Sequence, residues 1–207
     1  MDAHAATRAL ADMNSGDTQE QGGARDLILR VRGGDTGAFD ILMRQHERLV
    51  FGTALRLLGQ VDDAKDAAQD VFLRLFKYAG TLDPDQALAP WLYRVTVNVC
   101  RDLIRERMAA REVFAPDDPA RHAGGSTDGG IEGGLLAVQR RAVLQQALAH
   151  MPERERLALV LRDIEGLETR EVARMLGTSE VTVRTQVSRG RLRLRSLVDR
   201  MMKRTLP

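Results

Sequence analysis

Aromatic residues are scarce in this chain of 207 residues, in which Phe, Trp and Tyr together make up 4% of the sequence. A core with so few rings is packed from Leu, Val and Ala, a composition that favours helices. The single cysteine, Cys100, excludes an internal disulfide and any zinc cluster built on cysteines, and we expect it to be a small core residue. No stretch approaches the roughly 18 apolar residues of a membrane span, and no apolar signal core is present. We therefore expect no membrane insertion and a cytoplasmic location.

Charge is distributed unevenly along the chain, although the formal net charge is only +2. Residues 1–134 contain 16 Lys and Arg against 21 Asp and Glu, whereas residues 135–207 contain 15 against 8. The C-terminal part is therefore the expected binder of a polyanion such as nucleic acid.

Hydrophobic periodicity predicts helices in two groups, separated by a stretch that is rich in Gly and has no period. The predicted fold class is all-α, with two small helical domains joined by a flexible linker and a helix-turn-helix in the C-terminal domain. We expect a disordered segment at residues 1–24, a first domain at 25–110, the linker at 111–134 and a second domain at 135–207.

The helix-turn-helix is predicted between residues 168 and 195. A short amphipathic helix ends at Gly177, Thr178 or Ser179 caps a second helix, and Val183 begins the buried side of that second helix. A solvated amphipathic helix is the alternative interpretation. Groups that could bind base edges or phosphates in a major groove lie on the other sides of the second helix: Arg184, Thr185, Ser188, Arg189 and Arg193.

A helix predicted from about Asp62 to Tyr78 has an acidic N-terminal half. Carboxylates in a first turn stabilise the helix dipole, and the same side chains could also form a docking face for a basic partner helix. The residues alone leave both interpretations open. The side chains concerned are Asp62, Asp63, Asp66, Gln69 and Asp70.

Another helix is predicted from Pro90 onward, with a polar stripe along its outer face. The stripe could be solvated surface, or it could hold single-stranded nucleic acid, with Arg on phosphates and Asn on a base edge. Its members are Arg94, Asn98, Arg101 and Arg105, spaced +4, +3 and +4.

Catalytic patterns are missing, since there is no nucleophile and base set, no phosphate-binding Gly loop and no metal cluster. His46 has no other His or Cys at ligand spacing, so we expect a half-buried packing residue. We therefore expect no catalytic residue, no metal, no cofactor and no enzyme activity.

A set of segments, taken in order, resembles the extracytoplasmic-function (ECF) sigma factors, small two-domain promoter-recognition subunits of bacterial RNA polymerase. The motifs of that family are GDxxAF, AQEVF, WLYRIAxN, LPxR, LRxxEG and GTVxSRxxRAR. The corresponding segments here are Gly34-Asp35 with Ala38-Phe39, Ala68–Phe72, Trp91–Arg94 with Val97-Asn98, Met151–Arg154, Arg162–Gly166 and Val181–Arg191.

The resemblance implies roles for three sets of residues. Asp66, Gln69 and Asp70 would bind the clamp helices of the largest polymerase subunit. Asn98 would read a flipped-out base of the minus-ten element, assisted by Arg94, Arg101 and Arg105. The minus-thirty-five element would be read by Arg184, Thr185, Ser188, Arg189 and Arg191.

The implied partners are core RNA polymerase, promoter DNA and an anti-sigma factor, with the linker threading toward the polymerase active-site cleft. Three positions depart from the family pattern. Leu82 stands where an aromatic is common, Gln186 replaces an Arg, and Gly190 replaces an Ala at an expected cost of about 0.5–1 kcal/mol in helix stability. The main rival is a dimeric helix-turn-helix regulator, which predicts a βα receiver or ligand domain upstream.

Overall fold

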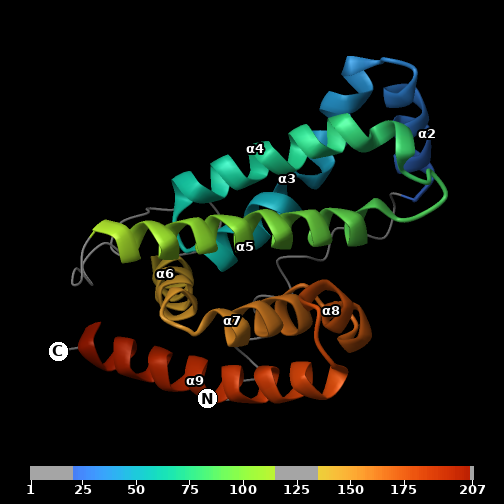
Figure 1. Ribbon diagram of the computed structural model, residues 1–207. Helices are drawn as coiled ribbons and strands as arrows, with labels where there is room; N and C mark the ends of the chain where they lie inside the picture. Colours follow the sequence, from blue (N-terminus) through green and yellow to red (C-terminus); the bar gives the residue numbers. More distant parts are fainter. Residues whose placement is uncertain (1–20, 115–134, 206–207) are drawn as a thin grey trace. The chain divides into compact units, whose positions relative to one another are not determined.

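The computed structural model describes residues 21–114 and 135–205, which form two compact units treated separately below (Figure 1). All regular structure in these ranges is helical and none of it is strand, so the predicted all-α class is confirmed. Residues 1–20 of the predicted disordered segment and most of the predicted linker lie outside the described residues. The prediction of disorder was wrong for residues 21–24, which form the first turn of a helix that begins at Gln21. The rival regulator needed strands upstream of the helix-turn-helix, and residues 21–114 contain none.

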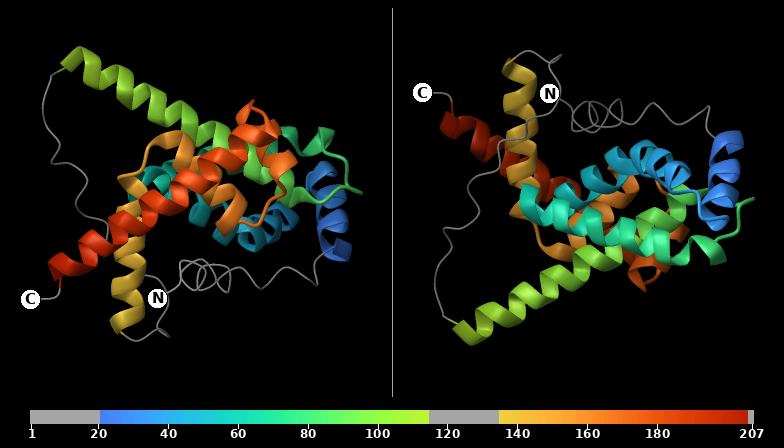
Figure 2. Two further views of the ribbon diagram at one scale, coloured as in Figure 1. Left: turned by 90° about the horizontal axis from the view of Figure 1, so that it is seen from below. Right: turned by 90° about the horizontal axis from the view of Figure 1, so that it is seen from above.

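The first unit is a helical bundle in which α3 packs against both α2 and α5. Figures 1 and 2 show α3 and α4 lying side by side in this unit. Its elements are α2 (Gln21–Arg32), α3 (Thr36–Leu58), α4 (Val61–Tyr78), the 3-10 turn η2 (Ala79–Thr81) and α5 (Leu88–Phe114).

The turn between α2 and α3 follows from Gly34 and Asp35, as the sequence predicted. Gly34 has φ of 87°, a left-handed conformation that glycine adopts without strain. Asp35 caps α3 by accepting a 3.0 Å hydrogen bond from the Ala38 N–H, and Arg30 donates to the same carboxylate. These bonds hold the pKa of Asp35 below its ordinary value, so the cap is present at neutral pH and is lost as pH falls through that lowered pKa.

The core of the first unit is mainly aliphatic side chains and small residues, as the scarcity of aromatics indicated, and Phe72 and Tyr93 are buried among them. Cys100 is buried in it, and His46 is buried with Nδ1 2.9 Å from the Leu42 carbonyl oxygen, which fits a packing role. The fully buried large side chains of this unit are Ile28, Leu42, Val50, Leu57, Val71, Leu75, Leu92 and Val97.

Helix α5 is longer than the sequence indicated. Loss of hydrophobic periodicity after Met108 suggested that the helix ended there, and the linker was predicted to begin at residue 111. The helix instead continues to Phe114. The added stretch includes Ala, Arg and Glu, which are strong helix formers and need no buried face to remain helical.

The second unit is organised around its longest helix, α9, against which α6, α7 and α8 all pack. Gly177, with φ of 64°, ends α8, and Ser179 caps α9 by accepting a 3.1 Å hydrogen bond from the Thr182 N–H. The predicted helix-turn-helix is therefore present. The elements are α6 (Leu135–Ala149), α7 (Glu153–Leu159), the π-helical turn η3 (Val160–Ile164), α8 (Thr169–Leu176) and α9 (Glu180–Thr205).

The hydrophobic periodicity after Pro152 indicates one helix ending at Gly166, but the second part of this segment is a wider turn. In η3 the Glu165 N–H donates to the Val160 carbonyl, a spacing of five residues that defines π geometry. Leu161 and Ile164 remain buried through this turn. The widened turn also carries Asp163, whose side chain reaches α9.

Gly190 lies where α9 packs tightly against α7. A Cβ added to Gly190 would lie 3.2 Å from the Glu155 carbonyl oxygen and 3.4 Å from both Leu159 Cβ and Met151 Cε. The expectation that glycine here only weakens the helix was therefore incomplete, because an alanine would also have to displace α7. The missing side chain is what lets the two helices pack.

We expect Gly190→Ala to lower the stability of the second unit by about 1–3 kcal/mol, because the added methyl meets backbone rather than a flexible side chain. Thermal unfolding followed by circular dichroism measures the change. Gly23→Ala in α2 is the matched control, since nothing lies within 4 Å of its added Cβ. Helix propensity should make that control neutral or stabilising. A Gly190→Ala protein that gains stability like the control would contradict the close-contact explanation.

Candidate nucleic-acid interfaces

The outward face of α9 presents exposed polar side chains in its first three turns, as predicted. Arg184 is exposed and donates a 2.9 Å bond to Glu180, one turn earlier. The Thr185 hydroxyl donates to the Val181 carbonyl at 2.9 Å, so its proton is used within the helix. Ser188 and Arg189 are exposed on the same side. This face combines guanidinium and hydroxyl groups that can bind base edges or phosphates.

Two other arginines of α9 pair with carboxylates of the supporting helices. Arg191 donates two hydrogen bonds to Asp163, at 2.6 and 2.7 Å, and this carboxylate side chain is only 6% exposed. The bonds to Asp163 raise the pKa of Arg191 above its ordinary value, so Arg191 stays cationic. Arg193 donates to Glu155 at 2.7 Å. Arg191, predicted to contact DNA, is therefore also a structural tie between α9 and η3.

The polar stripe predicted on α5 is present. Arg94, Asn98 and Arg105 are exposed, and Arg105 makes only a long 3.4 Å contact with Asp102. Arg101 differs from the prediction because it is half-buried, and its Nε is buried without a hydrogen-bond partner among the described residues. Three polar side chains of this face are therefore accessible, and the fourth, Arg101, is half-buried.

The loop before α5 is fastened to α2 by two arginines. Arg32 donates from Nε to the Ala79 carbonyl at 3.2 Å and from its terminal nitrogen to the Leu82 carbonyl. Arg25 pairs with Asp85 at 2.9 Å. The loop therefore has a defined position next to the start of the α5 stripe.

The acidic face of α4 is smaller than predicted, because one of its carboxylates points inward. Asp66 and Gln69 are exposed, and Asp70 is half-exposed beside Arg74 at 3.1 Å. Asp63, in contrast, is 19% exposed and pairs with Arg107 of α5. The expectation that Asp63 belongs to the acidic outer face was wrong, since its carboxylate joins two helices.

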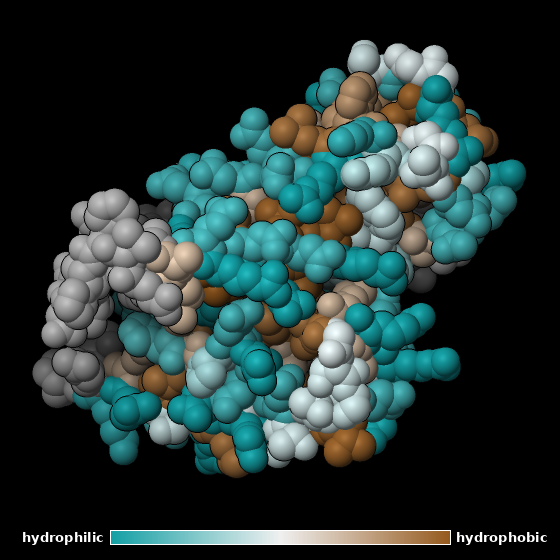
Figure 3. Space-filling view, in the orientation of Figure 1, coloured by the Kyte–Doolittle hydropathy of each residue, from teal (hydrophilic) through white to brown (hydrophobic). Residues whose placement is uncertain are grey.

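Apolar side chains continue the same face of α4 toward its C-terminal end. Leu73 and Phe76 are more than half exposed, and the Phe76 ring meets Phe39 of α3 edge-on with centroids 5.1 Å apart. Figure 3 shows apolar patches within a mostly hydrophilic surface. The α4 face is therefore acidic in its first half and apolar in its second.

Comparison with known proteins assigns both units. Residues 42–109 match sigma-70 region 2, and residues 141–194 match sigma-70 region 4. ECF RNA polymerase sigma factor SigM of Mycobacterium tuberculosis (strain Erdman) is 34% identical over 183 residues, covering 88% of each chain. RNA polymerase sigma-H factor of Pseudomonas aeruginosa is 30% identical and covers 84% of this chain and 92% of its own.

The chain belongs to the ECF sigma factors of the sigma-70 family. Solved structures agree in fold. A structure of CnrH in complex with the cytosolic domain of CnrY is 28% identical with a TM-score of 0.57, covering 85% of this chain and 97% of its own. A sigma factor RpoE from Bartonella quintana, solved with the anti-sigma factor NepR, has a TM-score of 0.56 at 21% identity, covering 75% and 96%.

Several residues that shape this sigma factor could not be found from sequence. Arg32, Asp163 and Glu155 meet partners 47, 28 and 38 residues away, respectively, and no local pattern marks such pairs.

Within the described residues, no three His, Cys, Asp or Glu side chains gather as a metal site, and no helix could cross a membrane.

We expect Asp163→Asn to destabilise the second unit by about 1–2 kcal/mol, because an amide replaces the carboxylate that accepts two charge-assisted bonds from a half-exposed Arg191. Chemical denaturation measures the loss. Glu180→Gln weakens an exposed pair within α9 and should cost only about 0.3–0.5 kcal/mol. Equal effects of the two substitutions would show that the Asp163 pair is an ordinary surface contact.

Proposed function

We propose that this sigma factor binds core RNA polymerase, reads two promoter elements with its two units and promotes strand opening, without catalysing a reaction itself. The observation that carries the proposal is that each matched segment presents an exposed helical face with arginines, on α5 in region 2 and on α9 in region 4. We assign region 2 to residues 25–110, the linker to 111–134 and region 4 to 135–207. The proposed location is the cytoplasm.

The upstream, minus-thirty-five element is assigned to the first turns of α9. In a helix-turn-helix the N-terminal part of the second helix contacts base edges in the major groove. Arg184 and Arg189 can bond guanine bidentately, and Ser188 and Thr185 can reach bases or phosphates. Arg191 lies beside this face, where its pair with Asp163 leaves it half-exposed for a phosphate.

The minus-ten element is assigned to the α5 stripe. Arg94 and Arg105 are placed to contact phosphates, with Arg101 behind them, while the Asn98 amide can hydrogen-bond a base edge. Flipping a base out of the duplex costs a few kcal/mol, which contacts to the flipped base can recover. Recognition and strand opening then become one event.

The exposed face of α4 is the proposed binding site for core polymerase, with contacts made by Asp66, Gln69 and Asp70. Carboxylates at this face complement a basic partner, and the apolar side chains that follow add area that binding would remove from water. An anti-sigma factor is a further proposed partner. The structure of CnrH in complex with the cytosolic domain of CnrY, in which CnrH is 28% identical to this chain, supports a protein partner of this kind.

We expect Asn98→Ala to impair strand opening while sparing core binding, because the amide would contact a base only once that base has left the stack. Permanganate reactivity of thymines in the minus-ten region measures opening, and size-exclusion chromatography with core polymerase measures binding. We predict a reduction in opening of at least about tenfold, the effect of 1.4 kcal/mol.

Glu106→Ala is the matched control, because Glu106 is exposed on α5 but lies off the stripe. It should leave both opening and core binding unchanged. Normal strand opening by the Asn98→Ala protein would show that Asn98 does not contact the flipped base. A parallel loss of opening and core binding would indicate a structural role instead.

A further inference from the structure

Val181 is an apolar side chain that the fold of the second unit does not use. It is 67% exposed, whereas Val183 and Val187 of the same helix are buried. A β-branched residue is also a poorer helix former than alanine, because its χ1 freedom is restricted in a helix. Neither packing nor helix propensity accounts for a valine at this position.

The position of Val181 places it on the proposed reading face. It is the second residue of α9, two positions after the Ser179 cap. Residues three and four positions later on a helix lie on the same face, which brings Val181 beside Arg184 and Thr185. The Thr185 hydroxyl is turned back to the Val181 carbonyl at 2.9 Å, so the two residues together present methyl groups. A small apolar surface therefore stands among the polar groups of the first turns.

The chemistry of the major groove offers one apolar group at the base edges, the 5-methyl of thymine. The N-terminal residues of the second helix are those that reach base edges in a helix-turn-helix. We propose that Val181, assisted by the Thr185 methyl, contacts a thymine 5-methyl in the upstream promoter element and so favours thymine at one position. This inference rests on the proposed function of α9.

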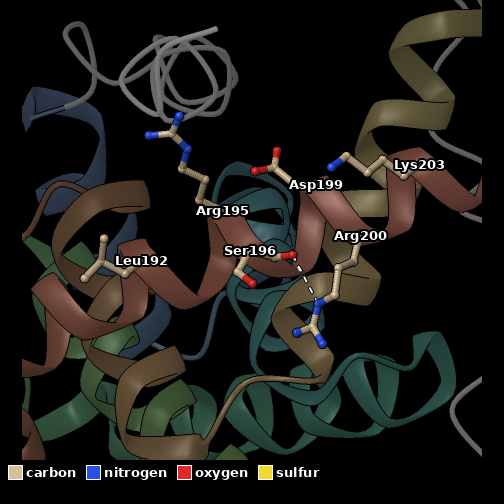
Figure 4. A pocket seen from close by; sticks show the side chains of 6 residues that line it. All are labelled: Leu192, Arg195, Ser196, Asp199, Arg200 and Lys203. Atoms are coloured by element: carbon tan, nitrogen blue, oxygen red, sulfur yellow. Dashed lines mark hydrogen bonds between the residues drawn. The ribbon is translucent and has the colours of Figure 1, made fainter.

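Leu192 provides a comparison on the same helix. It is 71% exposed but lies three turns beyond Val181, beyond the part of the helix that would reach bases. It lines a hollow along the C-terminal half of α9 with Arg195, Ser196 and Asp199 (Figure 4). Exposure alone therefore does not identify Val181 as a base contact. Its exposure in the first turn of α9 does.

The test uses the full chain reconstituted with core polymerase, on upstream elements selected from a randomised promoter library. Each thymine of the selected element is replaced in turn by deoxyuridine, which pairs identically and lacks only the methyl. At one position we expect the wild-type complex to bind about fourfold more weakly to the deoxyuridine promoter, the effect of one methyl returned to water. Val181→Ala should bind both promoters equally at that position.

Two controls separate the methyl contact from general weakening. Arg189→Ala should bind less tightly to the thymine and deoxyuridine promoters alike, which keeps the wild-type ratio. Leu192→Ala should match wild type in both affinity and ratio. Circular dichroism of each variant confirms an unchanged fold.

Three results would overturn the inference in distinguishable ways. If the library yields no bound promoter, the proposed function fails and the inference fails with it. If promoters are selected but no thymine is sensitive to loss of its methyl, the inference alone fails. A Val181→Ala complex that retains the wild-type ratio assigns the methyl contact to another residue.

Discussion

The contact between Gly190 and the backbone of α7 fixes how α9 lies in the second unit. Because a Cβ at this position would be 3.2 Å from the Glu155 carbonyl, only glycine allows the helix to lie this close without displacing α7. The pairs of Arg191 with Asp163 and of Arg193 with Glu155 then hold the helix against rotation. Which side chains face outward in the first turns of α9 is a consequence of these contacts.

The same contacts separate the arginines of α9 into those that pair with supporting helices and those that face outward. Arg191 and Arg193 bridge to the supporting helices, whereas Arg189 is exposed and Arg184 pairs with the neighbouring Glu180 of the same helix. A cationic helix is therefore not a uniform phosphate binder, since part of its charge is already matched by carboxylates within the protein. The first unit uses the same device, with Arg32 and Arg25 holding the loop before α5 while Arg94 and Arg105 stay exposed.

Local features of this protein could be predicted from its sequence, because each is decided by neighbours in the chain. The turn at Gly34, the Ser179 cap and the buried phase of α9 follow from periodicity and from capping chemistry. Features that depend on distant residues could not be predicted. The inward turn of Asp63 toward Arg107 is one example.

Gly190 shows the limit of reasoning from one helix at a time. Intrinsic helix propensity predicts only that glycine at this position lowers helix stability. The close contact with α7 explains why a glycine is present there. Gln186, which replaces an expected phosphate-binding arginine, likewise differs from its neighbours, because its side-chain oxygen is buried without a hydrogen-bond partner among the described residues. The absence of an arginine at this position is plain from the sequence, but the burial of the Gln186 side-chain oxygen could not be predicted.

Promoter reading by two units of one chain is tested most directly by run-off transcription with bacterial core polymerase that lacks any sigma subunit. Templates from a promoter library are compared with versions in which the upstream or the minus-ten element of an active template is scrambled. Two-unit recognition predicts specific transcripts only when the full chain is added, and loss of those transcripts when either element is scrambled. Absence of transcripts on every template, or transcripts that survive scrambling of one element, would contradict it.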